Sequence, residues 1–397
     1  MKQTLKILAV IACAVNLITF SACSHKTDNT VSASLDSLLS GIFTSPDEPG
    51  GIVLVAQGDS IVYTRSYGMA DLRREIPVCD TTLFNICSIS KIYSAVALVK
   101  LQEQGLLDID DSVTKYIPAL TNPHFRNITL RHLLTHTSGI PDTRPRDEKQ
   151  WHKYRRHHDS RFGSCRDYML YALSYESTKY LADIDTFAFE PGTAYEFQNP
   201  PYQLVLRIVE DASRKRFAPW MKANLFDPIG LSETMYFDPS LDQDLFSHGY
   251  VPEDGNNKYP SWHSADNRWE ESDYGECNFF PTKPDGGIFT TARDFFKWHR
   301  ALMGGKIISD SSLHMATTPY IATDKPYVST GLGFFIENRP GMPRKIFHAG
   351  NNGGYRAVEV YFPDSDVTYL IFANRPDWSY EDVCSEVDAI LSRYDII

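Results

Sequence analysis

Residues 84–105 read FNICSISKIYSAVALVKLQEQG, a polar start followed by a long apolar run. Apolar side chains recur there every three or four positions, the spacing of one face of an α-helix, at Ile92, Ala95, Val96 and Val99. Gly105 follows the run, and glycine is favoured just past the end of a helix. The pattern predicts an apolar helix that starts near Ser88.

Ser88 and Lys91 lie three residues apart at the start of this helix, so both side chains project from one face. A serine hydroxyl is a weak nucleophile until a base takes its proton, and a neighbouring lysine can be that base. The start of a helix also stabilises developing negative charge. Ser112 and Lys115 repeat the spacing, but Pro118 follows at once, so we expect that second copy to be structural.

Strand-like runs lie near both ends of the chain. Residues 51–57 and 60–67 flank Gly58-Asp59, a strong two-residue hairpin signal. Near the C-terminus, three more runs at residues 331–336, 355–362 and 367–373 precede an amphipathic stretch at 381–393. The middle, about 108–280, carries short helical patterns with many turn residues. We predict an α/β fold in which one sheet combines both ends of the chain and a mostly helical lobe interrupts it, with a site in the cleft between them.

The first residues have the layout of a secretory signal peptide, with Lys2 and Lys6 before an apolar run at 7–20. This run of 14 residues is short of the ~20 that a membrane-spanning helix needs. Ser21-Ala22-Cys23 resembles the lipobox of bacterial lipoproteins, which implies lipidation of Cys23. We therefore expect a signal peptide at 1–22, a linker at 23–34 and a hydrolase domain at 35–397, in a lipoprotein of the cell membrane or outer membrane that faces the periplasm or cell surface.

The chain is acidic, with 397 residues and a formal net charge of -11. Removal of residues 1–22 would leave 375 residues and a charge of about -13. An acidic protein repels nucleic acid, so we expect no nucleic-acid partner. The 42% of hydrophobic residues is enough for a large core.

Several segments along the chain match one known family in order and spacing. They are residues 84–91, 132–141, 191–192, Asn199, 286–287 and 348–350. Together they resemble the class C-like β-lactamase and D-aminopeptidase family, and the run at 132–141 is the most specific. The resemblance covers roughly residue 51 to the C-terminus, and it implies a β-lactamase/transpeptidase-like fold with an antiparallel sheet flanked by helices.

The resemblance implies a three-part site. Ser88 would attack a carbonyl carbon and form an acyl-enzyme, with Lys91 as the proton acceptor and Asn199 as a further catalytic group. His348-Ala349-Gly350 would take the place of the Lys-Thr-Gly motif, on a strand that lines the cleft, with His348 as a catalytic residue. Backbone N–H groups of Ser88 and Asn351 would form the oxyanion hole, and Gly350 and Asn351 would line the substrate site.

One position departs from the family pattern. Family members usually carry Tyr-x-Asn after the Pro-Gly pair, and here the register gives Phe197-Gln198-Asn199. The phenol that would pass protons between the serine and the leaving group is missing, although Phe197 keeps a place in the substrate site. We expect the neighbouring Tyr195 and Tyr202 to serve in packing.

No metal or cofactor is expected. His132 and His136 lie four apart, like two zinc ligands on a helix, but the glutamate of a His-Glu-x-x-His motif is absent. Beyond Cys13 and Cys23, five cysteines remain, an odd number without metal-ligand spacing, at Cys79, Cys87, Cys165, Cys277 and Cys384. Cys87 directly precedes Ser88, and we expect a small buried side chain rather than a nucleophile.

Two further segments have open interpretations. Residues 151–162 carry three histidines and several arginines that would bind an anionic group or, more in keeping with such composition, form a solvated helix face. The aromatic-rich segment at 259–280 would form a substrate wall or cover a lobe.

The sequence thus predicts an envelope serine hydrolase that cleaves an amide or ester through an acyl-Ser88 intermediate. Candidate substrates are peptidoglycan-type D-amino-acid peptides, small esters and β-lactams, with β-lactams the least favoured because fold does not fix substrate. The rival hypothesis is a catalytically weak binding protein for peptides or cell-wall fragments, and Phe197 is its main support. The oligomeric state is not indicated by the sequence.

Overall fold

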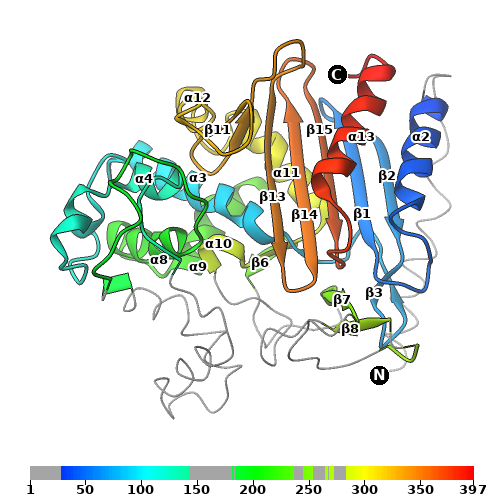
Figure 1. The fold of residues 1–397 in the computed structure, drawn as a ribbon, viewed down its shortest axis with the longest axis horizontal. Coiled ribbons are helices and arrows are strands. Elements are labelled where there is room, and N and C mark those ends of the chain that lie inside the picture. The colour runs from blue at the N-terminus through cyan, green and yellow to red at the C-terminus, as the bar shows by residue number, and fades with distance from the viewer. Residues whose placement is uncertain are drawn as a thin grey trace.

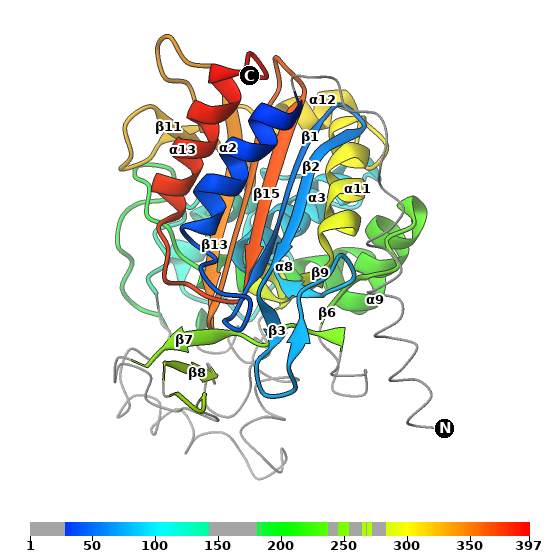
Figure 2. The same ribbon diagram turned by 90° about the vertical axis from the view of Figure 1, so that its right-hand side faces the viewer.

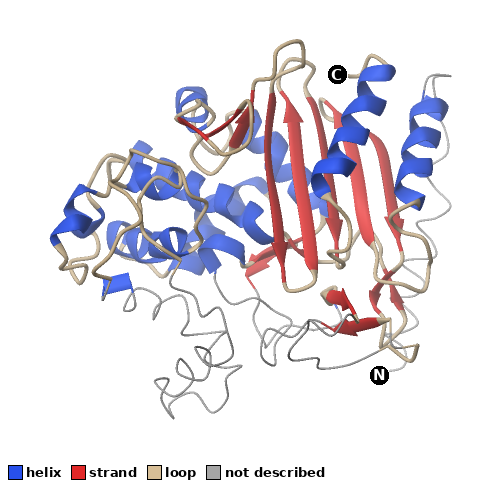
Figure 3. Cartoon of the chain, viewed as in Figure 1, coloured by secondary structure: helices blue, strands red, loops and turns tan. Residues whose placement is uncertain are grey.

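A computed structural model describes residues 28–142, 181–182, 184–236, 245–253, 264–266, 268–271 and 283–397. An eight-stranded sheet dominates these residues, and helices pack on both of its faces (Figures 1 and 3). The strand order is β10-β11-β12-β13-β14-β15-β1-β2, and every neighbouring pair is antiparallel. The strands are β1 (Gly51–Gln57), β2 (Ser60–Tyr67), β10 (Ile321–Ala322), β11 (Val328–Thr330), β12 (Phe335–Glu337), β13 (Lys345–Asn352), β14 (Tyr355–Phe362) and β15 (Val367–Ala373).

The two ends of the chain meet within this sheet, one strand in from its β2 edge, because β1 pairs with β15 over seven residue pairs. This arrangement confirms the predicted sheet. Side chains of β1 alternate between two cores: Ile52 and Leu54 face the helical lobe, whereas Val53 and Val55 face the outer helices. A strand covered on both faces has a continuous apolar sequence, as β1 has.

Two helices, α2 (Asp28–Ser40) and α13 (Tyr380–Arg393), lie side by side over the outer face of the sheet (Figure 2). Leu35 and Leu39 of α2 are fully buried in the outer core. Residues 28–34, which we expected to belong to a linker, are therefore part of α2. No helix within the described residues combines the length and apolar character needed to cross a membrane.

The inner face carries α3 (Ser90–Glu103) and α11 (Ala292–Met303), with the helical lobe beyond them (Figure 1). The other α-helices of the described residues are α4 (Leu130–Leu134), α8 (Pro200–Ser213), α9 (Phe217–Met221), α10 (Lys283–Gly286) and α12 (Asp310–Ala316). Shorter helical turns lie at η1 (Cys87–Ile89), η2 (Val113–Lys115), η3 (Pro123–Asn127), η4 (Lys222–Phe226) and η5 (Asp227–Ile229). Small sheets pair β3 (Met69–Asp71) with β4 (Ile76–Pro77), β5 (Phe84–Asn85) and β6 (Thr234–Tyr236) with β9 (Ile288–Thr290), and β7 (Tyr250–Pro252) with β8 (Trp269–Glu271).

One predicted strand is wrong. Residues 331–336 do not form a continuous strand, because β11 ends at Thr330 and β12 begins at Phe335. Gly333 between them has a φ of +80°, a left-handed conformation that breaks an extended chain. Its amide donates to Leu134 O at 3.3 Å, so this break brings the end of the sheet against the helical lobe.

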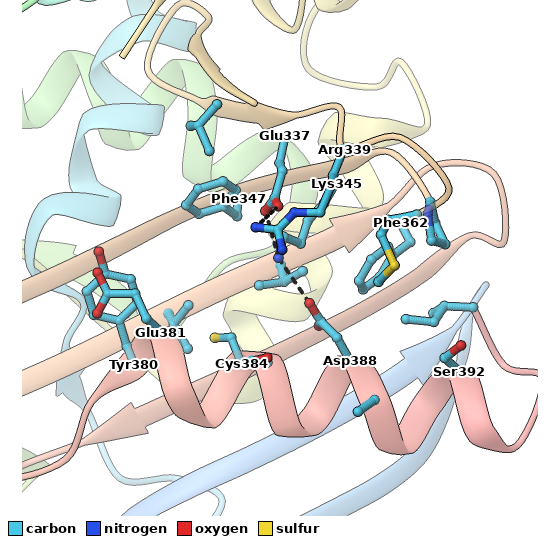
Figure 4. A pocket seen from close by; sticks show the side chains of 18 of the residues that line it. Glu337, Arg339, Lys345, Phe347, Phe362, Tyr380, Glu381, Cys384, Asp388 and Ser392 are labelled. Carbon is cyan, nitrogen blue, oxygen red and sulfur yellow. Dashed lines mark hydrogen bonds and ion pairs between the residues drawn. The ribbon is translucent and has the colours of Figure 1, made fainter. Parts of the chain in front are cut away.

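A pocket of about 710 Å³ lies between α13 and the outer face of β12, β13 and β14 (Figure 4). Lys345 Nζ forms ion pairs of 3.0 Å with Glu337 Oε2 and with Asp388 Oδ2, so its charge is already balanced. Phe347 lines the same pocket. Side chains alternate along a strand. His348 and Gly350, the residues of β13 that belong to the predicted site, therefore face the inner side of the sheet, opposite to Phe347.

Candidate active site

Ser88 lies in the tight turn that leads into α3. Cys87, the residue before it, has a φ of +51°, which is unusual for a residue with a side chain. The turn is held by Asn85, whose Oδ1 accepts the Cys87 N–H at 2.9 Å. Ser88 is partly exposed while its neighbours are buried. The strained turn therefore presents the Ser88 hydroxyl at the surface of an otherwise closed segment.

Lys91 is the only partner of the Ser88 hydroxyl for which the described residues show a hydrogen bond. Its side chain is fully buried. Its ammonium donates to Ser88 Oγ at 3.0 Å and to the carbonyl oxygen of Asp285 at 2.9 Å. The predicted nucleophile and base are thus in hydrogen-bond contact.

Three consecutive carbonyl groups of the short helix α10 accept hydrogen bonds from Lys91 and from side chains near it. Ser94 Oγ donates to Pro284 O at 2.5 Å, and Asn85 Nδ2 donates to Gly286 O at 3.0 Å. The bond from the lysine to Asp285 O lies between them. Buried polar groups of this kind are costly to leave unpaired, so the three bonds lock α3 and the serine turn onto α10.

Gly350 on β13 packs against the serine turn. A Cβ atom at this position would lie 2.5 Å from Ser88 N and 2.5 Å from Cys87 Cβ, closer than such atoms approach each other. Glycine therefore lets β13 come within contact of the turn. The predicted neighbours Ser88 and Gly350 are indeed side by side.

The register of β13 determines where the Asn351 amide points. Gly353 and Gly354, with φ of +49° and +83°, form a two-residue hairpin loop, so the flanking pair Asn352 and Tyr355 is hydrogen-bonded. Hydrogen-bonded and non-hydrogen-bonded pairs alternate along an antiparallel ladder. The N–H of Asn351 therefore points away from β14, on the edge that β12 leaves open, since β12 pairs with β13 only as far as Phe347.

His348 is buried, and it lies on the same face of β13 as Gly350. Its Nδ1 lies 2.8 Å from the carbonyl oxygen of Ala349, which can only accept, so Nδ1 carries the proton. Burial, and then the charge of Lys91, lower the pKa of His348 to about 3. His348 is therefore a neutral imidazole whose Nε2 has a lone pair.

Phe197 lies next to Lys91, as the predicted register requires. The lysine Nζ is 5.2 Å from the centre of the Phe197 ring, and 38% of this residue is exposed. Asn199 occupies the N-cap position of α8, and no hydrogen bond joins its side chain to Ser88 or Lys91 among the residues that the structure describes. The predicted role of Asn199 thus stays a prediction.

The two nearby tyrosines differ in exposure. Tyr202 is buried, donates its hydroxyl to Leu134 O at 2.7 Å, and has a pKa raised by burial. Tyr195 is partly buried, and its ring centre lies 6.3 Å from that of His136. Both rings pack against the same loop, in agreement with the packing role that we expected.

His136 belongs to the site, which the sequence interpretation missed. The residue is buried, and its ring centre lies 4.5 Å from that of Phe197 and 5.1 Å from that of Tyr202. Burial, then the charge of Lys91, lower its pKa well below the usual value. His132 instead accepts the Thr129 N–H at the start of α4, at 3.2 Å. No cluster of metal-ligating side chains occurs in the described ranges.

The other predicted residues fall into two groups. Ser112 caps η2, and Lys115 pairs with Asp111 at 2.6 Å on the surface, so this copy of the motif is structural. Cys87 is buried, and burial raises its pKa; within the described part of the chain neither Cys87 nor Cys384 forms a disulfide. Outside the described residues lie Cys23, Cys165, Cys277, residues 151–162 and most of 259–280.

The comparisons with known proteins agree with this geometry. A family model described as Beta-lactamase matches residues 35–391. Penicillin-binding protein 4* of Bacillus subtilis (strain 168) is 27% identical over 335 residues, which cover 83% of this chain and 69% of the relative. The D-aminopeptidase of Gluconobacter oxydans (strain 621H) is 22% identical over 350 residues, covering 87% of this chain and 59% of the relative.

Two solved structures share the fold. A penicillin binding protein from Bacillus halodurans superposes with a TM-score of 0.71 at 24% identity, covering 90% of this chain and 98% of that one. The D-amino acid amidase from Ochrobactrum anthropi SV3 gives 0.72 at 20% identity, covering 93% and 99%. The β-lactamase/transpeptidase-like architecture predicted from the sequence is thereby confirmed.

Proposed function

The chain belongs to the beta-lactamase family, and we propose that it is a serine hydrolase that cleaves an amide or ester bond through an acyl-Ser88 intermediate. The observation that carries this proposal is the 3.0 Å contact between the buried Lys91 Nζ and Ser88 Oγ. A nucleophile and a base within hydrogen-bond reach, with the base oriented by a third group, is the arrangement that covalent catalysis needs. Asp285 O is the third group here.

In the proposed reaction, neutral Lys91 takes the proton of the Ser88 hydroxyl as the oxygen attacks the substrate carbonyl carbon. The negative charge on the carbonyl oxygen is stabilised by the backbone N–H groups of Ser88 and Asn351, each worth ~3 to 4 kcal/mol in acyl transfer. The tetrahedral intermediate then expels the leaving group, which receives the proton that Lys91 took from Ser88, and water hydrolyses the acyl-enzyme. His348 Nε2, a neutral acceptor, would orient a hydrogen-bond donor of the substrate.

D-amino-acid amides and peptides are the substrate class that we favour, followed by small esters. The support comes from relatives whose names include D-aminopeptidase and D-amino acid amidase. β-Lactams remain the least favoured candidate, because proteins of one fold catalyse different reactions.

Labelling with a fluorophosphonate and with a penicillin, followed by mass mapping, tests the nucleophile. The probe mass should appear on the peptide that contains Ser88, and Ser88→Ala should abolish both the label and the hydrolysis of nitrophenyl acetate. Ser112→Ala is the matched control, because this serine has the same spacing to a lysine but caps η2, and it should leave both signals intact.

The rival function, a binding protein with little turnover, is favoured by Phe197 in place of the usual tyrosine. It predicts that cell-wall peptides bind wild type and Ser88→Ala equally well, while neither protein hydrolyses esters or takes the label. That result would refute the hydrolase proposal.

A further inference from the structure

His136 has a backbone conformation that few residues with side chains adopt. Its φ is +57°, and Cys87, which directly precedes Ser88, shares this left-handed conformation with a φ of +51°. Such strain persists only where the surroundings hold it, and it is concentrated at functional sites. The fold thus maintains an unfavourable conformation at His136, and the contacts of this residue indicate why.

Two hydrogen bonds connect His136 to the segment that carries Phe197. The carbonyl oxygen of His136 accepts the Glu196 N–H at 3.0 Å, and its Nδ1 accepts the Gln198 N–H at 3.2 Å. The backbone N–H groups on both sides of Phe197 therefore donate hydrogen bonds to the same residue, His136. Only the second of these bonds depends on the His136 side chain.

The ring of His136 also packs against two aromatic rings that lie beside Lys91. Phe197 and Tyr202, whose ring centres lie 4.5 and 5.1 Å from that of His136, are the same rings that lie 5.2 and 5.5 Å from Lys91 Nζ. A shift of His136 would therefore move an aromatic ring that contacts the catalytic ammonium.

The hydrogen bond to Gln198 fixes the tautomer of the imidazole. A backbone N–H can only donate, so Nδ1 is the acceptor and the single proton of the neutral ring is on Nε2. Burial and the nearby charge of Lys91 favour this neutral form. The neutral ring keeps the bond, whereas a second proton, on Nδ1, would break it.

We infer that His136 is a positioning residue of the acyl-transfer site, which holds Phe197 over Lys91 by accepting the Gln198 amide at Nδ1. This inference rests on the proposed Ser88 hydrolase function. It assigns a role to a histidine that touches neither Ser88 nor a metal.

Three substitutions separate positioning from other roles. His136→Asn keeps an acceptor, Oδ1, at the position of Nδ1, and asparagine tolerates the left-handed conformation. His136→Gln moves the amide group one carbon farther out, and His136→Ala removes the acceptor. We expect the Gln and Ala variants to lose ~100-fold in the rate of Ser88 labelling by the fluorophosphonate, as a misplaced catalytic group does, whereas the Asn variant retains most of it.

His132 offers a matched control four residues earlier. Its Nδ1 also accepts a backbone N–H, from Thr129 at 3.2 Å, but at the start of α4 rather than beside Lys91. His132→Ala should lower the unfolding midpoint and leave the labelling rate of the folded protein unchanged. A loss of rate that merely reflects lost stability would affect both histidine sites alike.

Hydrogen exchange of the Gln198 amide gives a readout that needs no activity. Exchange should accelerate in His136→Ala and His136→Gln and stay slow in His136→Asn. Wild-type labelling rates in the Ala and Gln variants, unchanged Gln198 exchange in them, or an Asn variant as slow as Ala would overturn the inference. A wild type that is never labelled at Ser88 would refute the hydrolase function instead, and the exchange rates would then decide the positioning role alone.

Discussion

Phe197 places an aromatic ring without a hydroxyl 5.2 Å from the Lys91 ammonium. A phenol there would accept and return a proton during acyl transfer, a contribution typically worth ~10²- to 10⁴-fold in rate. We expect Phe197→Tyr to raise kcat/KM for an amide at least ~10-fold more than for a matched ester, because amides have the poorer leaving group. Since 38% of this residue is exposed, the added hydroxyl should cost little stability.

The matched control for this substitution is Phe335→Tyr, which adds a hydroxyl to a ring whose centre is 6.4 Å from that of Phe197 and 5.2 Å from that of His348. It should leave the amide-to-ester ratio unchanged. If Phe197→Tyr also leaves this ratio unchanged while the protein stays folded, another group already supplies the proton. His348 is a poor source, because a histidine with a pKa of about 3 holds no second proton at neutral pH.

At this scale, local spacing predicted what lies within one helical turn and the family resemblance supplied the rest. Ser88 and Lys91 are in contact because residues three apart share a helix face. The register of the family motif correctly placed Phe197 beside them. His136 was missed because its role depends on a left-handed backbone and on an amide 62 residues away, neither of which has a local sequence signal.

At the scale of elements, the contact between β13 and the serine turn has no spare room. Gly350→Ala would bring a Cβ atom to 2.5 Å from Ser88 N, and because that atom belongs to the backbone, the strand itself must shift. A displacement of about 1 Å in a catalytic group can cost ~100-fold in rate, so we expect a loss of this size in Ser88 labelling.

Gly41→Ala is the control, because it makes the same glycine-to-alanine change at a position far from Ser88 in the chain. The added Cβ atom would lie 3.2 Å from its nearest neighbour, Leu38 O. It should leave the labelling rate unchanged. Labelling of Gly350→Ala at the wild-type rate would show that β13 can move without disturbing the oxyanion hole.

Four strands were predicted to the residue, whereas α3 begins at Ser90 rather than at Ser88, and a strand boundary set by a single backbone angle was missed. β1, β2, β14 and β15 have the predicted bounds, because each is a β-rich run with a turn at its end. The strand at 331–336 failed because Gly333 adopts a positive φ. The start of α2 was missed, although Val31, Leu35 and Leu39 recur every four residues and all three are buried.

At the scale of the whole molecule, two buried neutral histidines lie where the lobes meet. His348 comes from β13 of the sheet, and His136 comes from the loop after α4 in the helical lobe. Both have pKa values lowered first by burial and then by the charge of Lys91. The pairing of distant strands was predictable from sequence, but this junction was not, because burial of a histidine depends on the packing of both lobes.

Acid should therefore destabilise the protein well above the pH at which its carboxylates are protonated. Below the ordinary histidine pKa of 6.5 the unfolded chain takes up protons that the folded protein refuses, so the stabilising effect of each buried neutral histidine is present above pH 6.5 and is lost as pH falls toward about 3. Between pH 6.5 and 5.0 this amounts to about 2 kcal/mol of unfolding free energy for His348, and the lowered pKa of His136 acts in the same direction.

Urea unfolding of the wild type at pH 7.5 and at pH 5.0, compared with the double variant His136→Asn/His348→Asn, measures this effect. The wild type should lose at least about 2 kcal/mol more between the two pH values than the variant, because asparagine does not titrate. Carboxylates with lowered pKa values, such as Asp71 and Asp110, start from an ordinary value of 3.8, so they lose their contribution only below this window. Equal losses in the two proteins would mean that the histidines are protonated without separating the lobes, and that the junction admits charge or water more readily than its burial implies. The single variant His348→Asn should lie between them, since each histidine contributes through its own proton.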